Sequence, residues 1–183
     1  MSPPTDHERR FVAALRRLAD NEDRAALAAL RRGLGKPVGE VADLYPYVVP
    51  WLPPEPSWRQ EQAFYLVAAL FAWHQRSWSE SEGGGWTNLG ASFARLADDS
   101  GSIEGRFVAL LNCHRDELPD HLRSAVGLLK AKEIHVDWAQ LLRDVQEWER
   151  EDRKVQRDWA RAFWGSRPGT PGEVPATAQP AAE

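Results

Sequence analysis

The stretch DWAQLLRDVQEWEREDRKVQRDWARAFW, residues 137–164, decides the fold class of this 183-residue chain. Its apolar side chains recur at steps of three and four residues, the spacing that keeps them on one face of an α-helix. The stripe comprises Trp138, Leu141, Val145, Trp148, Val155, Trp159 and Phe163, with Asp152 as its charged member. The pattern predicts one long C-terminal helix that begins near Asp137, with the charged run 149–154 as the place for a bend.

The N-terminal residues carry two further helix signals. Thr5 and Glu8 form a capping box, and the apolar spacing after it predicts a helix to about Asp20. Asp23 can cap a second helix, because its carboxylate can accept from a free backbone N–H of the first turn. Gly35 is the expected stop of that helix.

The middle of the chain also favours helices. Five prolines in YPYVVPWLPPEP (45–56) argue against a regular helix, and its aromatic residues indicate an ordered, packed loop. Ser57 and Gln60 then form a second capping box, which opens an apolar helix through residues 64–71. Further helices are expected over 89–97, from Ser102 onward and over 118–131. Since no longer segment shows β alternation, the sequence predicts an all-α bundle of about seven or eight helices.

Composition predicts one helical domain and a tail. Apolar residues make up 43% of the chain and nine residues are tryptophan, enough for a sizeable core. We expect a single domain over residues 1–164, in which N-terminal and C-terminal sub-bundles could meet near 79–102. Residues 165–183 are rich in Pro, Ala and Gly, so a disordered tail is expected there.

The sequence favours a cytoplasmic protein. The N-terminus MSPPTDHERR is too polar for a signal peptide, and the apolar run 63–74 is too short to span a bilayer. Cys113 is the single cysteine, so the chain cannot form an internal disulfide, as is usual in a reducing compartment. We therefore expect no membrane contact.

Catalytic patterns are weak. His114 and His121 lie near Cys113, Asp116 and Asp120, the one mixed cluster of the chain, but the spacing matches no established metal or nucleophile motif. The glycines of SESEGGGW (79–86) lack the lysine and the following helix of a phosphate-binding loop, and are read as a linker. The sequence therefore predicts a protein that is not an enzyme and has neither a metal nor another cofactor.

The basic residues are unevenly distributed. The net charge is −4, yet residues 1–36 carry eight Lys and Arg against five Asp and Glu. In the second helix, Arg24, Arg31 and Arg32 have no carboxylate four residues away on the same helix, and Lys36 follows its end. Guanidinium groups without a carboxylate partner suit phosphate contacts, because they bind phosphate oxygens in pairs. The alternative is a solvated helix face, which these residues alone favour.

A second basic set lies around the helices near residues 102–112 and 118–131: Arg106, Arg115, Arg123, Lys130 and Lys132. Ordinary surface charge explains this set at least as well as a binding surface does. Trp138, Trp148 and Trp159 are expected in the core. Trp78 and Trp86 flank the glycine loop, where packing is again favoured over stacking on nucleic-acid bases.

An ordered set of segments resembles the CasB family, the small subunit of type I-E CRISPR Cascade complexes. The segments are RF..LL (106–111), L..HLR..V.LL (118–129), VDWAQLL.D...W (136–148) and VQ..WAR.FW (155–164), together with ALAALRRGLG (26–35). The resemblance extends over about residues 8–164. It implies an all-helical, non-catalytic subunit present in two copies in the complex.

The resemblance also implies partners and a role. These are guide RNA and DNA, contacted through the backbone, other Cascade subunits and a second copy of the chain. The protein would stabilise guide RNA, target DNA and the displaced non-target strand through a basic surface, while base pairing reads the sequence. The expected nucleic-acid-binding residues are Arg24, Arg31, Arg32, Lys36, Arg106, Arg123, Lys130 and Lys132. The alternative is a purely structural adaptor that contacts only other protein subunits.

Overall fold

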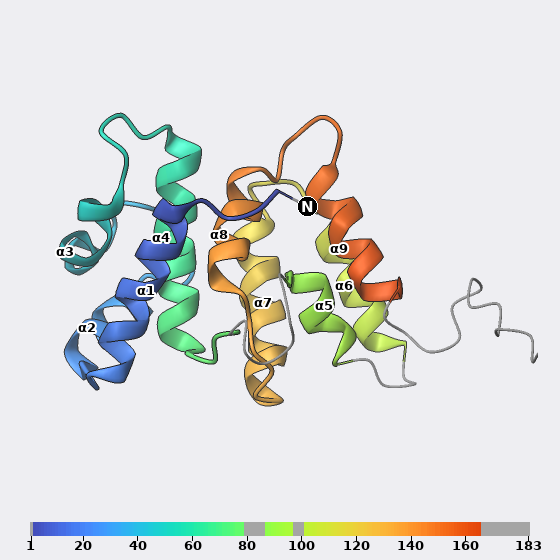
Figure 1. Cartoon of the computed structure of the whole chain (residues 1–183), viewed down its shortest axis with the longest axis horizontal. Helices are drawn as coiled ribbons and strands as arrows, with labels where there is room; N and C mark the ends of the chain where they lie inside the picture. Colours follow the sequence, from blue (N-terminus) through green and yellow to red (C-terminus); the bar gives the residue numbers. More distant parts are fainter. Residues whose placement is uncertain (1, 79–86, 97–100, 166–183) are drawn as a thin grey trace, which may run out of the picture.

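The computed structural model describes residues 2–78, 87–96 and 101–165, and these residues are helical apart from turns and one isolated bridge between Ser77 and Val136. The all-α class predicted from the sequence is confirmed. Helices α1 to α4 lie at one end of an elongated molecule, α7 and α8 in the middle, and α5, α6 and α9 at the other end (Figure 1). Of the predicted tail (165–183), Gly165 is the last residue of a helix, while residues 166–183 and the predicted glycine loop (79–86) lie outside the described residues.

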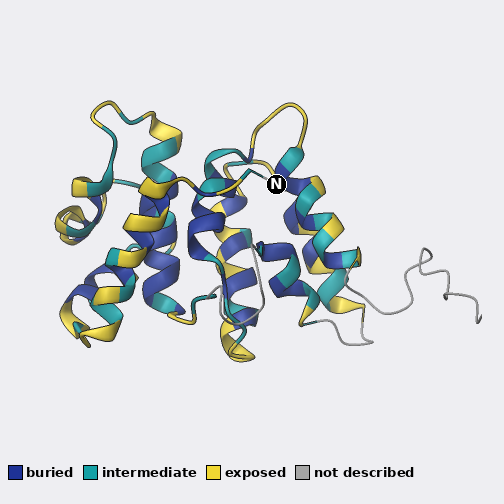
Figure 2. Cartoon of the chain, in the orientation of Figure 1, coloured by how far each residue is buried: buried dark blue, intermediate teal, exposed yellow. Residues whose placement is uncertain are grey.

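The first four helices are α1 (Asp6–Asp20), α2 (Arg24–Arg31), α3 (Tyr45–Val48) and α4 (Trp58–Trp73). Both predicted capping boxes are confirmed: the Thr5 and Ser57 hydroxyls accept from Glu8 N and Gln60 N. Helix α4 has nine buried residues on several sides, as expected of a helix that passes through the core. Figure 2 shows buried segments where these helices face one another.

The expectation of a loop over 45–56 is wrong in part. Helix α3 forms there, between 3-10 turns at Ala42–Leu44 and Val49–Trp51. Pro46 and Pro50 lie in the first turns of these short elements, where the backbone N–H that proline lacks would have no partner. The prolines therefore restrict helix length and permit short helical turns.

The remaining helices are α5 (Leu89–Ala94), α6 (Ser102–Asn112), α7 (Leu118–Ala131), α8 (Trp138–Gln146) and α9 (Lys154–Gly165). Helices α5 and α9 cross closely at Gly90, where an added Cβ would lie 2.1 Å from the Trp159 carbonyl oxygen. The buried apolar side chains form one cluster that draws on helices from both ends of the molecule.

The prediction of a single long C-terminal helix is wrong. Residues 147–153 form a turn between α8 and α9, and Arg153 adopts a left-handed φ of 47°. The Asp152 carboxylate accepts from Lys154 N at 3.1 Å at the start of α9. Helix α9 then folds back, so that the rings of Trp148 and Trp159 lie 5.1 Å apart. Split helices and the short α3 raise the number of α-helices to nine within the described residues, against the seven or eight expected.

Helix α8 ties the N-terminus to the C-terminal half. Gln140 Nε2 donates to the Ser2 carbonyl at 3.0 Å, and Gln146 Nε2 donates to Glu8 Oε1 at 2.8 Å. Glu8 is only 3% exposed, and Arg143 lies 3.7 Å from the same carboxylate oxygen. Ser2 and Glu8 are thus held by side chains of α8 that lie more than 130 residues later in the sequence.

Candidate nucleic-acid interface

The eight cations predicted to bind nucleic acid are all exposed. Helix α2 begins with the Asp23 carboxylate accepting from Ala26 N at 2.9 Å. It ends at Arg31, and Gly35 follows in a left-handed turn with φ 72°. The buried leucines of α2 pack against α1 and α4 and so fix the helix in place. The position of the helix in turn fixes where Arg24 and Arg31 emerge.

The terminal nitrogens of Arg24 and Arg31 have no partner among the residues that the structure describes. Arg31 Nε donates to the Leu27 carbonyl of its own helix at 3.1 Å, which leaves both terminal nitrogens without a partner in the described part of the chain. Arg24 makes no side-chain hydrogen bond or ion pair with any described residue. Both meet the requirement for a phosphate contact.

The other two cations of this set are paired. Arg32 forms an ion pair of 2.5 Å with Asp43, and Lys36 forms one of 2.5 Å with Glu40. The absence of a carboxylate on the same helix did not leave Arg32 unpaired, because Asp43 reaches it from the next segment. A phosphate that binds Arg32 or Lys36 must therefore compete with a carboxylate.

The second basic set is divided in the same way. Arg123 pairs with Asp120 at 3.1 Å, and the Lys130 ammonium lies 5.0 Å from the centroid of a Trp73 ring. Arg106 and Lys132 have no side-chain partner among the residues that the structure describes.

The basic residues of α2 and those around α7 come close to each other at one point. The Arg123 guanidinium lies against Gly35, where an added Cβ would be 2.7 Å from its nitrogen. Lys36 follows Gly35 directly, so the turn after α2 meets α7 there.

Helix α1 carries two arginines that the sequence reasoning did not single out. Arg10 Nε donates to the Asp6 carbonyl at 3.3 Å and Arg17 Nε to the Ala13 carbonyl at 3.4 Å, the same arrangement as at Arg31. The signal was present in the spacing, since arginines at 10, 17, 24 and 31 recur every seven residues.

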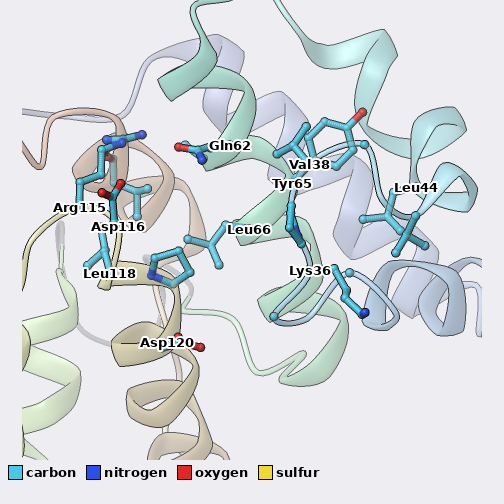
Figure 3. Close-up of a pocket in the computed structure, with 18 residues that line it drawn as sticks. Lys36, Val38, Leu44, Gln62, Tyr65, Leu66, Arg115, Asp116, Leu118 and Asp120 are labelled. Atoms are coloured by element: carbon cyan, nitrogen blue, oxygen red, sulfur yellow. Dashed lines mark hydrogen bonds between the residues drawn. The ribbon is translucent and has the colours of Figure 1, made fainter.

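A groove with a cavity of about 320 Å³ is lined by α4, by the segment that leads into α7 and by residues 33–44, which follow α2 (Figure 3). Gln62 lies opposite Arg115 and Asp116 at one end of it, and Leu66 points towards the start of α7. Arg115 crosses this region and donates to the Val145 carbonyl at 3.1 Å and to the Arg59 carbonyl at 2.9 Å. The Lys36 ammonium is directed away from the centre of the groove.

The residues around Cys113 do not form a metal-binding group within the part of the chain that the structure describes, and the Cys113 thiol is not activated. Cys113 is buried, and burial raises the pKa of its thiol to about 11, so the thiol is protonated at neutral pH. Over residues 2–78, 87–96 and 101–165, no three His, Cys, Asp or Glu side chains lie close enough to hold a metal ion.

The expected core tryptophans are confirmed: Trp138, Trp148 and Trp159 are at most 3% exposed. None of the described helices is both long and apolar enough to cross a membrane.

The fold and its surface define an all-helical protein that presents exposed cations around a groove and on its outer helices. The sequence matches the CRISPR-associated protein Cse2 family over residues 26–164. It is 39% identical to a CRISPR-associated protein Cse2 of Thermus thermophilus over 164 residues, which covers 86% of this chain and 89% of that protein. The chain belongs to the Cse2 family of CRISPR-associated proteins.

Solved structures agree with this assignment. The crystal structure of a Cse2-family protein from Thermus thermophilus matches with a TM-score of 0.74 and 36% identity, over 91% of this chain and all of that chain. CasB from M. ruber matches with a TM-score of 0.74 and 34% identity, over 88% and 94% of the two chains. A chain of a CRISPR RNA-guided surveillance complex matches with a TM-score of 0.72 and 31% identity, over 86% and 91%.

Proposed function

We propose that this chain is a non-catalytic small subunit of a cytoplasmic CRISPR RNA-guided surveillance complex. In that complex it stabilises guide RNA, target DNA and the displaced non-target strand through its exposed cations. The observation that carries the proposal is the structural match, over 86% of the chain, to a protein chain of such a complex. Other subunits and a second copy of the chain are the proposed protein partners.

Physical chemistry supports a backbone contact. Arg24, Arg31, Arg106 and Lys132 are exposed and lack a carboxylate partner within the described residues, so phosphate binding displaces only water and counterions. In RNA-guided recognition, base pairing reads the sequence. A subunit of this kind needs only electrostatic contacts, and a net charge of −4 is compatible with them because the local potential decides binding.

The test is the salt dependence of binding to single-stranded DNA. Arg31→Ala combined with Arg32→Ala should weaken binding and flatten the slope of log affinity against log salt by up to about one unit for each phosphate that is no longer bound. Arg→Lys at both positions should restore only part of the affinity, because lysine lacks the paired donors. The effect of Ala should be larger at Arg31 than at Arg32, which already pairs with Asp43.

A matched control removes two arginines outside the proposed surface. Arg59→Ala combined with Arg76→Ala makes the same charge change at exposed arginines that pair with Glu149 and Glu133. Equal flattening in both double variants would show a general charge effect and refute a located surface. Crosslinking of the assembled complex to guide RNA and both DNA strands then identifies the peptides that touch each strand.

The pairing of Arg32, Lys36 and Arg123 with neighbouring carboxylates favours a second candidate, the purely structural adaptor. An adaptor predicts that the Arg31 and Arg32 double variant binds DNA and supports interference normally. Lower affinity with an unchanged salt slope would likewise indicate that the arginines bind another protein subunit.

A further inference from the structure

We propose that the groove between α4 and the start of α7 receives one unpaired nucleobase of a strand whose phosphates contact Lys36 and Arg123. The inference rests on the proposed function, since it places a base beside cations taken to contact the backbone. It adds a recognition element that electrostatics alone does not supply: a preference for unpaired over paired nucleotides.

The size and walls of the groove fit a single flat group. A cavity of about 320 Å³ is at the small end of the usual range for ligand pockets, about 300–1,000 Å³, and is too small for a duplex or a partner helix. Leu66, Leu118 and Pro119 provide an apolar wall between α4 and α7. Such a wall accepts the face of any base, because every base has an apolar face.

The polar end of the groove is matched to the edge of a base. Gln62 and Asp116 face this end, and neither side chain makes a hydrogen bond to any described residue (Figure 3). An amide can pair with adenine and a carboxylate can accept from an amino group of a base. Arg115 also lines this end, where its two terminal nitrogens are already engaged by the Val145 and Arg59 carbonyls, so the edge of a base is left to Gln62 and Asp116.

The same polar end disfavours an apolar anchor from a partner protein. An aliphatic or aromatic side chain would cover the Asp116 carboxylate and the Gln62 amide without offering them hydrogen bonds, which costs desolvation free energy. The Arg123 guanidinium lies against Gly35, and Lys36 is the next residue of the same turn, which lines the groove; a strand entering with one base would place its phosphates along this turn. Both cations would then exchange their carboxylate partners, Glu40 and Asp120, for phosphate.

The first measurement compares two strands on the full chain. Fluorescence anisotropy should show that a single-stranded oligonucleotide binds about tenfold more tightly than an abasic strand of the same length and charge. The salt slopes of the two strands should be equal, because their phosphates are the same. Equal affinity for the two strands would overturn the proposal and leave the backbone contact intact.

The second measurement fills the groove. Leu66→Trp should lower the affinity for the base-bearing strand to that of the abasic strand and leave binding of the abasic strand unchanged. Gln62→Ala, a smaller change, should lower the base-bearing strand's affinity about threefold in the same selective way. The control is Val108→Trp, which enlarges an exposed residue of α6 (39% exposed) away from the groove and should change neither affinity.

The remaining outcomes separate this inference from the proposed function. If no strand binds, the proposed function fails, and the groove is tested directly by adding adenosine monophosphate and following the Leu66 methyl resonances by NMR. Shifts of the groove resonances in the wild type that are lost in the Leu66→Trp variant would support the groove as a base site. The absence of any shift in the wild type would refute it. Normal binding of both strands by Leu66→Trp together with failure of subunit assembly would assign the groove to a protein partner and refute the inference.

Discussion

Asp144 is a carboxylate enclosed between α8 and α9 that the proposed function does not use. Trp159 Nε1 donates to one of its oxygens at 2.6 Å and Gln140 Nε2 donates to the other at 2.8 Å. Burial raises the pKa of this carboxyl from 3.8 to about 7, and the nearby charges of Glu147 and Asp137 act in the same direction, against the two hydrogen bonds. Loss of its proton therefore places a charge in the contact between the two helices.

Asp144→Asn should change how stability depends on pH. The folded state keeps a proton on Asp144 that the unfolded state releases above about pH 4. The contribution of this proton to the free energy of unfolding is therefore full below pH 4 and lost as the pH rises through 7. Between pH 4 and pH 8 the free energy of unfolding of the wild type should fall by up to about 4 kcal/mol through this group. The asparagine variant should not show this fall. Urea unfolding of both proteins from pH 4 to 8 measures the difference, and parallel curves would contradict it.

At the scale of helices, the crossing of α5 and α9 depends on one missing methyl group. Gly90→Ala would place Cβ 2.1 Å from a backbone oxygen of α9, so the helices must separate. We expect a loss of about 1–3 kcal/mol in the free energy of unfolding, as for other overpacked contacts. Gly105→Ala is the matched control, because nothing lies within 4 Å of an added Cβ in α6, and it should stabilise by about 0.5–1 kcal/mol. Chemical denaturation of the two variants should show opposite signs.

The tryptophans of α8 and α9 should be the costliest apolar side chains to truncate. Trp138 and Trp159 are 1% and 0% exposed. Trp138→Ala or Trp159→Ala should each cost about 3–5 kcal/mol of stability. Thermal melting curves like those of the wild type would contradict the placement of either ring in the core.

Helix starts were predictable from the sequence because they depend on local chemistry. The capping residues Thr5, Asp23, Ser57 and Asp137 each accept a hydrogen bond from a backbone N–H two or three residues into the helix. The break at 147–153 was missed, because a helix that folds back can bury a stripe of the same spacing as a continuous one. The periodicity reports which side chains are buried and not whether the helix between them is continuous.

At the scale of the whole molecule, the candidate site was predictable only in part. The sequence identified exposed cations, since charged residues between apolar ones point outward on an amphipathic helix. Their pairing was missed, because Asp43 reaches Arg32 from another segment. The meeting of Arg123 with Gly35 depends on how α7 packs against the turn after α2, which no local pattern records.

Removal of residues 166–183 should leave the fold and nucleic-acid binding unchanged. Proline and small residues bury too little apolar surface to offset the entropy of ordering the chain. A chain that ends at Gly165 should melt and assemble as the full chain does. A chain that ends before Phe163 is the control and should be destabilised, because Phe163 is 0% exposed. Loss of assembly in the first truncation would assign a role to the tail.

The hold of α8 on the N-terminus sets an order for folding during synthesis. Glu8 leaves the ribosome long before Gln146, its hydrogen-bond partner 138 residues later, has been translated. Translation proceeds at about 5–20 residues per second, so the Glu8 carboxylate must wait several seconds for its partner on α8. Helix α1 can pack against α2 and α4 earlier, but its contact with α8 can form only after α8 has been translated, so this step of folding comes late.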